Sequence, residues 1–226
     1  MTQYKYETHL HTSEVSLCSS CPGKEWVHHY KSLGYTGIFV TNHFFNAPIA
    51  VPEELPWEAQ VEMFCKGYEE MVQEGAKVGL DVFFGWEYSA VGFTHFLTYG
   101  LDKAWLLANP DVIEWNLLTY FDRVHESGGA IVHAHPFREG VEHIHLFPNK
   151  IDAVEIINGC RTVESNQHAS DFAKSYNIPE TAGSDIHHIT QKRFSGILTS
   201  KKLTCAGDYI EVIKSDDAVL FDECCQ

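Results

Sequence analysis

Basic residues are scarce in this sequence. Its 226 residues include 16 lysines and arginines against 31 aspartates and glutamates, which gives a formal net charge of −15. A surface this acidic repels nucleic-acid backbones and anionic membranes, so we expect neither a nucleic-acid polymer nor a membrane as a partner. A small anionic phosphate substrate is still compatible with this charge if bound cations reverse the local field. The charge balance indicates no particular oligomeric state.

Long apolar runs and an export signal are also missing. No stretch approaches the roughly 20 apolar residues of a membrane-spanning helix. The opening MTQYKYETHLHT lacks the basic start and apolar run of a signal peptide. The seven cysteines are an odd number, and without an export signal they favour reduced thiols over disulfides. These features predict a cytoplasmic protein.

One pair of cysteines has the spacing of a metal or redox motif, Cys18-X-X-Cys21. No second pair accompanies it, unless Cys224 and Cys225 fold back toward it. We therefore expect no metal or redox function for this motif, and replacement of both cysteines should leave the metal content intact.

The periodicity of the sequence favours a mixed α/β fold. Hydrophobic residues make up 44% of the chain, and its length suits a single domain spanning residues 1–226. The expected strands are Tyr4–Thr8, Gly37–Thr41, Val82–Trp86, Thr94–Tyr99, Ala130–His133, Ala153–Ile157 and Glu180–Gly183. The expected helices are Lys24–Leu33, Glu58–Val78, Val112–Ser127 and Val163–Tyr176. Such alternation favours parallel strands, and the number of strands favours a barrel over an open sheet without deciding between them. Asn46–Pro56 is expected to loop over one end of the fold.

Histidine is the main chemical signal, with 14 in the chain. His9 and His11 follow the first expected strand, where alternate residues face the same side. Further candidates lie in or near the C-terminal ends of later strands, and they are His43, Glu87, His95, His135, Asp185 and His187. In a barrel these ends converge on one face. Nitrogen and carboxylate donors without cysteine suit Zn, Mn or Fe(II) in a hydrolytic site.

Each feature also has a simpler interpretation when taken alone. A histidine at a strand end is more often a hydrogen-bonded loop residue than a ligand, and the segment 183–187 is compatible with a turn and a helix cap. Their recurrence at successive strand ends favours a metal centre. The histidines outside these motifs are expected mostly at the surface, and they are His28, His29, His125, His143, His145, His168 and His188.

Five ordered motifs carry a resemblance to a known family: Thr8-His9-Leu10-His11-Thr12, Thr41-Asn42-His43, Gly85-Trp86-Glu87, Ala134-His135-Pro136 and Gly183-Ser184-Asp185-Ile186-His187. Together they resemble the polymerase and histidinol phosphatase (PHP) family over about Tyr4 to Ile197. The resemblance implies a distorted (β/α)7 barrel, similar to a TIM barrel. It also implies a trinuclear metal centre that hydrolyses phosphate esters.

The resemblance further implies which residues hold the two to three divalent ions, whether Zn, Mn or Fe. The first ion would bind His9, His11, Glu87 and Asp185. The second would share Glu87 and bind His95 and His135. The third would bind His43, His187 and Glu14.

Two positions near these ligands are expected to support them. Asn42 stands where the family often has aspartate, and we expect it to orient His43 rather than to bind a metal. His133 competes with His135 as a ligand, but His135 matches the His-Pro pair of the family. His133 is expected on the same strand face, behind the ligands.

The favoured function is hydrolysis of a small-molecule phosphomonoester such as histidinol phosphate, a nucleotide or a sugar phosphate. Glu87, Asp185 and His187 are the expected catalytic residues around a metal-activated water, and the general acid is left open. Arg138 and Arg161 follow strand ends and are expected to bind the phosphate, although each is also compatible with an ordinary surface arginine. The alternatives are hydrolysis of a phosphodiester, a protein phosphotyrosine or an amide, and a non-enzymatic scaffold.

Overall fold

The strands join in one sheet in the computed structural model, which describes residues 3–215 and 217–224. They are β1 (Tyr4–Leu10), β2 (Gly37–Val40), β3 (Asp81–Ser89), β4 (His95–Tyr99), β5 (Ala130–Ala134), β6 (Ala153–Asn158), β7 (Glu180–Gly183), β8 (Arg193–Thr199) and β9 (Ala218–Cys224). Their order in the sheet is β7-β6-β5-β4-β3-β2-β1-β8-β9. The first seven therefore lie side by side in chain order.

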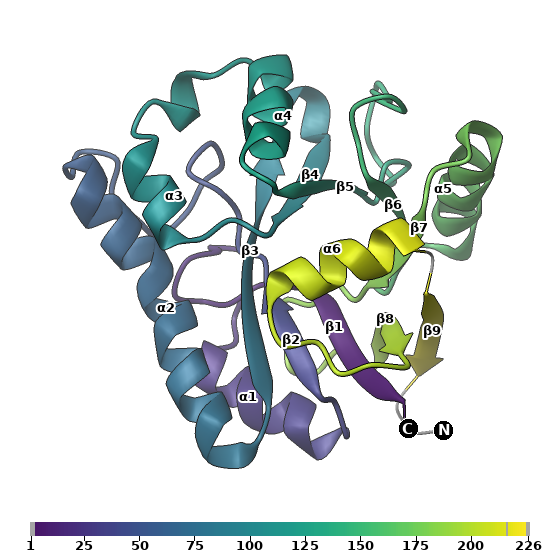
Figure 1. The fold of residues 1–226 in the computed structure, drawn as a ribbon, viewed down its shortest axis with the longest axis horizontal. Coiled ribbons are helices and arrows are strands. Elements are labelled where there is room, and N and C mark those ends of the chain that lie inside the picture. The colour runs from purple at the N-terminus through teal and green to yellow at the C-terminus, as the bar shows by residue number, and fades with distance from the viewer. Residues whose placement is uncertain (1–2, 216, 225–226) are drawn as a thin grey trace.

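The sheet curls until β7 and β1 meet (Figure 1). β8 pairs antiparallel with the first half of β1, where Tyr6 lies opposite Ile197. Further along, Leu10 forms a parallel bridge with Ile186 just after β7. The result is a mixed α/β, nearly closed, TIM-barrel-like sheet in a single domain, which confirms the predicted fold class.

One strand departs from the expected parallel pattern. β4 pairs antiparallel with both β3 and β5. It follows β3 after only a short turn at Val91–Phe93, whereas a parallel pairing needs a crossover of about a dozen residues. The start of β4 therefore lies where β3 and β5 end, with His95 opposite Ser89 and Ala134. Our placement of His95 near a C-terminal strand end is wrong, yet its side chain reaches the same face of the barrel.

The helices are α1 (Gly23–Ser32), α2 (Trp57–Val78), α3 (Lys103–Ala108), α4 (Leu117–Glu126), α5 (Val163–Tyr176) and α6 (Ala206–Ser215), with short 3-10 turns at Val91–Phe93 and Val112–Glu114. The expected helix Val163–Tyr176 is confirmed. The expected helix Val112–Ser127 is divided, because Asn116 has an extended backbone and caps α4 by accepting a hydrogen bond from Thr119 N at 3.0 Å. No described helix is both long and apolar enough to cross a membrane.

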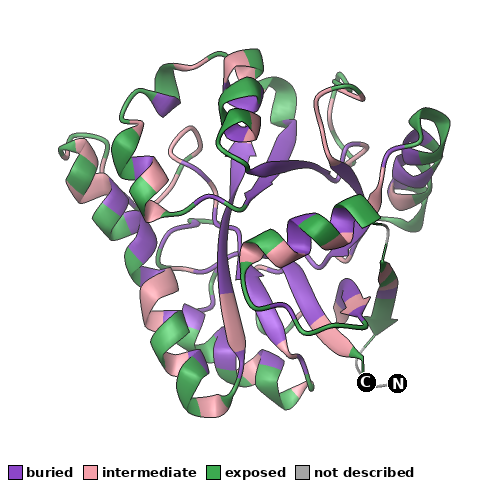
Figure 2. Cartoon of the chain, viewed as in Figure 1, coloured by how far each residue is buried: buried purple, intermediate pink, exposed green. Residues whose placement is uncertain are grey.

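Helix α6, which the sequence analysis did not predict, closes the barrel at the end opposite to the histidines. Its Tyr209 ring packs 4.9 Å from both Phe39 and Tyr99 inside the barrel. The Tyr209 hydroxyl also lies 2.6 Å from Thr181 Oγ1. Figure 2 shows α6 across the barrel, with buried residues on one side of the helix and exposed residues on the other. Helix α6 thus covers the end of the barrel that lies away from the histidines.

The acidic C-terminal segment contributes an edge strand as far as residue 224. β9 pairs antiparallel with β8, and Arg193 donates to both carboxylate oxygens of Asp222 at 2.8 and 2.7 Å. A planar guanidinium group matches a carboxylate in this way. The tail therefore stabilises the edge of the sheet beside β8.

Candidate metal centre

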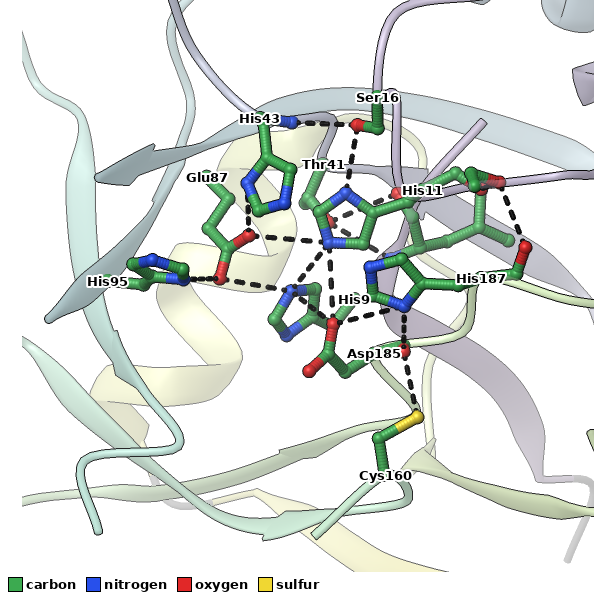
Figure 3. A network of polar contacts seen from close by, with 12 residues as sticks. His9, His11, Ser16, Thr41, His43, Glu87, His95, Cys160, Asp185 and His187 are labelled. Atoms are coloured by element: carbon green, nitrogen blue, oxygen red, sulfur yellow. Dashed lines mark hydrogen bonds and ion pairs between the residues drawn. The ribbon is translucent and has the colours of Figure 1, made fainter. Parts of the chain in front are cut away.

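The strand ends bring eight of the predicted ligands together, and all of them except His135 are labelled in Figure 3. The cluster consists of His9, His11, His43, Glu87, His95, His135, Asp185 and His187. They come from β1, β3 and the start of β4, and from the segments that follow β1, β2, β5 and β7. Residues far apart in the sequence thus meet because the barrel aligns the ends of its strands.

The Glu87 carboxylate lies at the centre of the cluster, only 1% exposed. Its Oε1 atom lies 2.8 Å from His95 Nδ1 and 3.1 Å from His135 Nε2. Its Oε2 atom lies 2.8 Å from His43 Nδ1 and 3.4 Å from His11 Nε2. A carboxylate with imidazoles beside both of its oxygens has the arrangement that a ligand shared between two ions needs.

The Asp185 carboxylate faces the same histidines from the opposite side. Its Oδ1 atom lies 3.5 Å from His9 Nε2 and 3.4 Å from His11 Nε2, and its Oδ2 atom lies 3.7 Å from His135 Nε2. Asp185 and His135 both have a positive φ, +53° and +30°. Such a backbone costs free energy in a non-glycine residue and is typical of functional sites. In both residues the positive φ occurs just after a strand, and it turns the side chain into the cluster.

Hydrogen bonds on the far side of two rings fix where their lone pairs point. His9 Nδ1 lies 2.9 Å from Glu155 Oε1, so this nitrogen carries the proton. His11 Nδ1 lies 3.0 Å from Ser16 Oγ, whose own proton is donated to Asn42. The two Nε2 atoms are left with lone pairs that face each other at 3.2 Å. Facing lone pairs repel unless a cation binds them, so this donor set fits divalent metal ions.

Two buried atoms without hydrogen bonds support this fit. Glu87 Oε2 and His43 Nδ1 have no hydrogen-bond partner among the described residues, although they lie 2.8 Å apart. Buried polar atoms rarely lack a partner. Both are atoms that metals bind, and both point into the cluster.

The electrostatic field of the cluster favours a cation. Burial raises the pKa of Glu87, but His95 and neighbouring imidazoles hold it well below its usual value. Burial also raises the pKa of Asp185, but neighbouring imidazoles, chiefly that of His9, hold this pKa well below its usual value. Burial lowers the pKa of His9, but Glu155, Asp185 and Glu87 raise it well above its usual value. The site therefore attracts positive charge, whether a proton or a metal ion.

Two buried glutamates behind the ligands were missed from the sequence. Glu155 Oε1 holds His9 as described, and its Oε2 accepts from His135 N at 3.0 Å. Glu7 Oε1 accepts from His9 N at 2.8 Å and from Ser184 N at 2.9 Å. The available signal was a charged residue within an apolar strand, since a buried carboxylate needs partners.

Asn42 supports the cluster by a different route from the one expected. Its Oδ1 atom accepts from Thr12 N at 2.7 Å and from Ser16 Oγ at 3.0 Å. Ser16 Oγ in turn accepts from His43 N at 3.0 Å and contacts the His11 ring. Asn42 therefore positions the segment that carries Ser16. Among the described residues, the Asn42 side chain makes no hydrogen bond to the His43 ring.

His133 does not lie behind the ligands, and that expectation is wrong. Its ring packs against Phe96 and Phe172, with centroids 4.7 and 6.5 Å away. Burial lowers the pKa of His133 to about 3, so the ring is neutral. The reason is the positive φ of His135, which interrupts the strand alternation between the two residues.

Glu14, the expected ligand of the third ion, lies outside the cluster. Both of its carboxylate oxygens accept from Gly23 N, at 2.9 and 3.1 Å, at the start of α1.

Cys18 lies beside His43 and His187, where Glu14 was expected. Its sulfur and the nitrogens of three histidines lie within 4.8 Å of one another, and these are His11, His43 and His187. Burial raises the pKa of Cys18, but contacts with His187 and His43 lower it to about 6.

A cavity of about 630 Å³ opens beside the cluster at His43 and His95. Much of its lining is apolar and comes from the start of the predicted loop Asn46–Pro56 and from the turn before β4, including Pro48 and Phe93. The cavity is the approach to the cluster from solvent, and its apolar wall suits a carbon-rich part of a ligand.

The two predicted phosphate-binding arginines have different surroundings. Arg138 lines the cavity, with its guanidinium 5.7 Å from the centroid of the Phe93 ring. Its buried Nε has no hydrogen-bond partner among the described residues. Arg161 instead contacts Asp185 Oδ2 at 3.1 Å and Glu139 Oε2 at 3.7 Å. Arg161 is therefore occupied in holding a ligand, whereas Arg138 is free to meet a substrate.

Several solved structures have a fold similar to that of this chain. No family model and no curated protein matches the sequence. A two-domain protein containing a predicted PHP-like metal-dependent phosphoesterase, from Bacteroides vulgatus, aligns with 97% of the chain at a TM-score of 0.71 and 14% identity. PsfC from Pseudomonas syringae aligns with 98% of the chain and 92% of its own length, at a TM-score of 0.66 and 17% identity.

Endonuclease Q in complex with a 27-mer duplex containing an abasic lesion is also similar. It aligns with 95% of the chain at a TM-score of 0.62 and 14% identity. The chain spans 65% of the Bacteroides protein and 57% of Endonuclease Q. These likenesses confirm a PHP-type barrel as the fold.

Proposed function

We propose that the chain is a metal-dependent phosphoesterase of the PHP family that hydrolyses a small-molecule phosphomonoester. The observation that carries the proposal is the pair of imidazole lone pairs of His9 and His11, 3.2 Å apart beside the buried carboxylates of Glu87 and Asp185. Such a donor set fits a divalent cation. The PHP-type fold supports the choice of phosphate esters as substrates.

The residues divide into sites as the resemblance implies, except for Glu14. His9, His11, Glu87 and Asp185 would hold one ion. Glu87, His95 and His135 would hold a second, and His43 and His187 belong to a third. Bound Zn, Mn or Fe ions would neutralise phosphate charge and lower the pKa of a water molecule.

The remaining residues of the site prepare it for this chemistry. Glu155 keeps the proton of His9 on Nδ1 and thereby leaves Nε2 free as a donor to a metal. Arg138 faces the cavity and would bind a phosphate oxygen. The apolar wall near Phe93 would hold the alcohol part of the ester. His187 lies with Nδ1 2.7 Å from Asp185 O, and we propose it as a ligand that positions the substrate rather than as a proton donor.

Cleavage of a DNA phosphodiester is the second candidate. The likeness to Endonuclease Q favours it, because that protein is seen with a DNA duplex. The net charge of −15 opposes it, since DNA binding depends on basic residues that neutralise the backbone. We therefore place the small phosphomonoester first. A cytoplasmic location and a single working domain belong to the same proposal.

A panel of substrates separates these candidates. The protein is reconstituted with Zn, Mn or Fe(II) and assayed on histidinol phosphate, nucleoside monophosphates, sugar phosphates, a simple phosphodiester, a phosphotyrosine peptide, an acetylated amide and an abasic DNA duplex. We expect the highest kcat/KM for a phosphomonoester, with loss of activity in chelator. Preference for the duplex or the diester would support the second candidate. Full metal content without turnover of any compound would indicate a scaffold.

A further inference from the structure

The segment that carries Cys18 is anchored on both sides against the cluster. Before Cys18, Ser16 Oγ contacts the His11 ring and accepts from His43 N at 3.0 Å. After Cys18, Ser19 Oγ donates to His11 O at 3.0 Å and lies 3.1 Å from His187 O. Ser20 N also donates to His187 O at 3.0 Å. These bonds hold Cys18 in place beside the histidines.

Cys18 and Cys21 have opposite surroundings despite their Cys-X-X-Cys spacing. Cys21 is 2% exposed and packs in an apolar cluster with Trp26 and Val27. Its sulfur contacts only Pro22 O among the hydrogen-bond acceptors of the described residues, at 3.6 Å. Cys18 instead lines the cavity and contacts His43 and His187. The two cysteines therefore do not form a chelating pair.

The surroundings of Cys18 contain further unused donor atoms. His11 is fully buried, and its Nε2 atom faces the cluster 3.2 Å from His9 Nε2. His43 lies between Glu87 and Cys18 and contacts both. The carboxylate of Glu14, which a third site would otherwise use, is occupied at the start of α1. Cys18 is the side chain that completes the group.

We propose that Cys18, His43 and His187 form a thiolate–imidazole cation site at the mouth of the cavity, selective for zinc over manganese or magnesium. Thiolate is a soft ligand that favours zinc, whereas manganese and magnesium prefer oxygen ligands. The proposal rests on the proposed metal centre and reverses our expectation from the Cys18-X-X-Cys21 motif that replacing these cysteines leaves the metal content intact. Because Cys18 lines the cavity, an ion bound there meets the substrate as it enters.

Cobalt(II) is a suitable probe, because a thiolate bound to Co(II) gives a charge-transfer absorption band in the near ultraviolet. The full-length protein, purified under reducing conditions and stripped of metal, is titrated with Co(II). We expect this band in the wild type and its loss in Cys18→Ser. The control Cys205→Ser removes an exposed thiol outside the cluster and should keep the band. Zinc content should fall by one equivalent in Cys18→Ser only.

A second variant tests whether Cys18 binds the metal or only supports the local structure. Cys18→Asp should recover the lost equivalent without the near-ultraviolet band and should shift the preference toward manganese. Cobalt binding to the wild type without the band, or a band that persists in Cys18→Ser, overturns the thiolate site while leaving the other sites standing. Failure of the wild type to bind cobalt at all overturns the proposed metal centre itself. Circular dichroism establishes that each variant is folded.

Discussion

At the scale of single residues, Glu87 is the side chain on which the proposed metal centre depends most. Its two oxygens lie within 3.4 Å of nitrogens from four histidines. No other carboxylate among the described residues has this position. Its neutral isostere, glutamine, keeps the shape of the side chain and removes the charge.

Glu87→Gln should lose metal and turnover together. Removing a residue that hydrogen-bonds to a metal ligand costs roughly 10–100-fold in metal affinity. Removing the charge of the ligand itself should therefore cost about 100-fold or more. Elemental analysis and kcat on the best phosphomonoester measure the two effects. Glu142→Gln, at an exposed position, is the matched control. A folded Glu87→Gln protein with full metal content and wild-type rate would refute the assignment.

The two arginines should respond differently to replacement. Arg138→Ala should keep the metals and lower kcat/KM by roughly 10–150-fold, because a hydrogen bond to a charged group contributes about 1.5–3 kcal/mol. Arg138→Lys should recover only part of this, since a point charge does not reproduce the guanidinium fork. Arg161→Ala should instead reduce metal affinity, because Asp185 loses its partner at 3.1 Å.

Steady-state kinetics and metal titrations of the three arginine variants check these effects. If Arg138→Ala keeps the wild-type kcat/KM, the metals alone bind the phosphate. If Arg161→Ala binds metal as tightly as the wild type, Asp185 is held by its other contacts. Loss through KM alone would assign Arg138 to binding of the ground state, and loss through kcat would assign it to the transition state.

At the scale of elements, helix α1 explains why the Glu14 carboxylate lies outside the histidine cluster. The residue before the helix is Pro22, which has no side-chain group to cap it. The first N–H groups of a helix need acceptors, and the Glu14 carboxylate supplies them at Gly23 N. A carboxylate at the N-terminus of a helix is also favoured by the helix dipole.

Glu14→Ala should therefore destabilise the protein without changing its metal content. Loss of a capping side chain costs about 0.5–2 kcal/mol, and an exposed position such as this one belongs at the lower end. Urea unfolding monitored by circular dichroism measures the change, with Glu54→Ala as the control at another exposed glutamate. The loss of one metal equivalent in Glu14→Ala would restore Glu14 as a ligand.

At the scale of the whole molecule, metal binding and stability should be linked. The barrel buries four carboxylates at one end, those of Glu7, Glu87, Glu155 and Asp185. Bound cations compensate this charge only in the folded state. A ligand present at about 100 times its Kd adds about 2.7 kcal/mol to the stability of the state that binds it.

Chelation should therefore lower the melting temperature by roughly 5–10 °C, since 1 kcal/mol corresponds to about 2–4 °C at this chain length. Differential scanning calorimetry with and without a chelator measures the shift, and added zinc should reverse it. Glu87→Gln should show a smaller shift. An unchanged melting temperature in protein that is shown to lose its metal would contradict the linkage.

Much of the fold follows from local patterns in the sequence. The helix Val163–Tyr176 and the strand Glu180–Gly183 agree with the expected bounds, because helical and strand periods are local properties. The antiparallel direction of β4 was missed, although its short connection to β3 leaves no room for the crossover that a parallel pairing needs. Strands β8 and β9 and helices α3 and α6 were also missed from the sequence.

The sequence by itself determined the chemistry of the site. Histidines and carboxylates at successive strand ends predicted a cluster, and the barrel brings eight of the nine expected ligands together. This worked because the ends of neighbouring strands converge whatever the loops do. The scarcity of basic residues was likewise sufficient to argue against a polymeric anion as the first choice of substrate.

Only the tertiary structure decided which neighbouring side chain turns toward the cluster. His135 points in and His133 points out because of one positive φ. Cys18 lies beside the histidines and Glu14 does not, because hydrogen bonds from Ser19 and Ser20 to His187, more than 160 residues away, hold the Cys18 segment against them. The sequence shows which residue types are available near each strand end. The direction of its side chain depends on contacts between distant segments, which form only when the barrel closes.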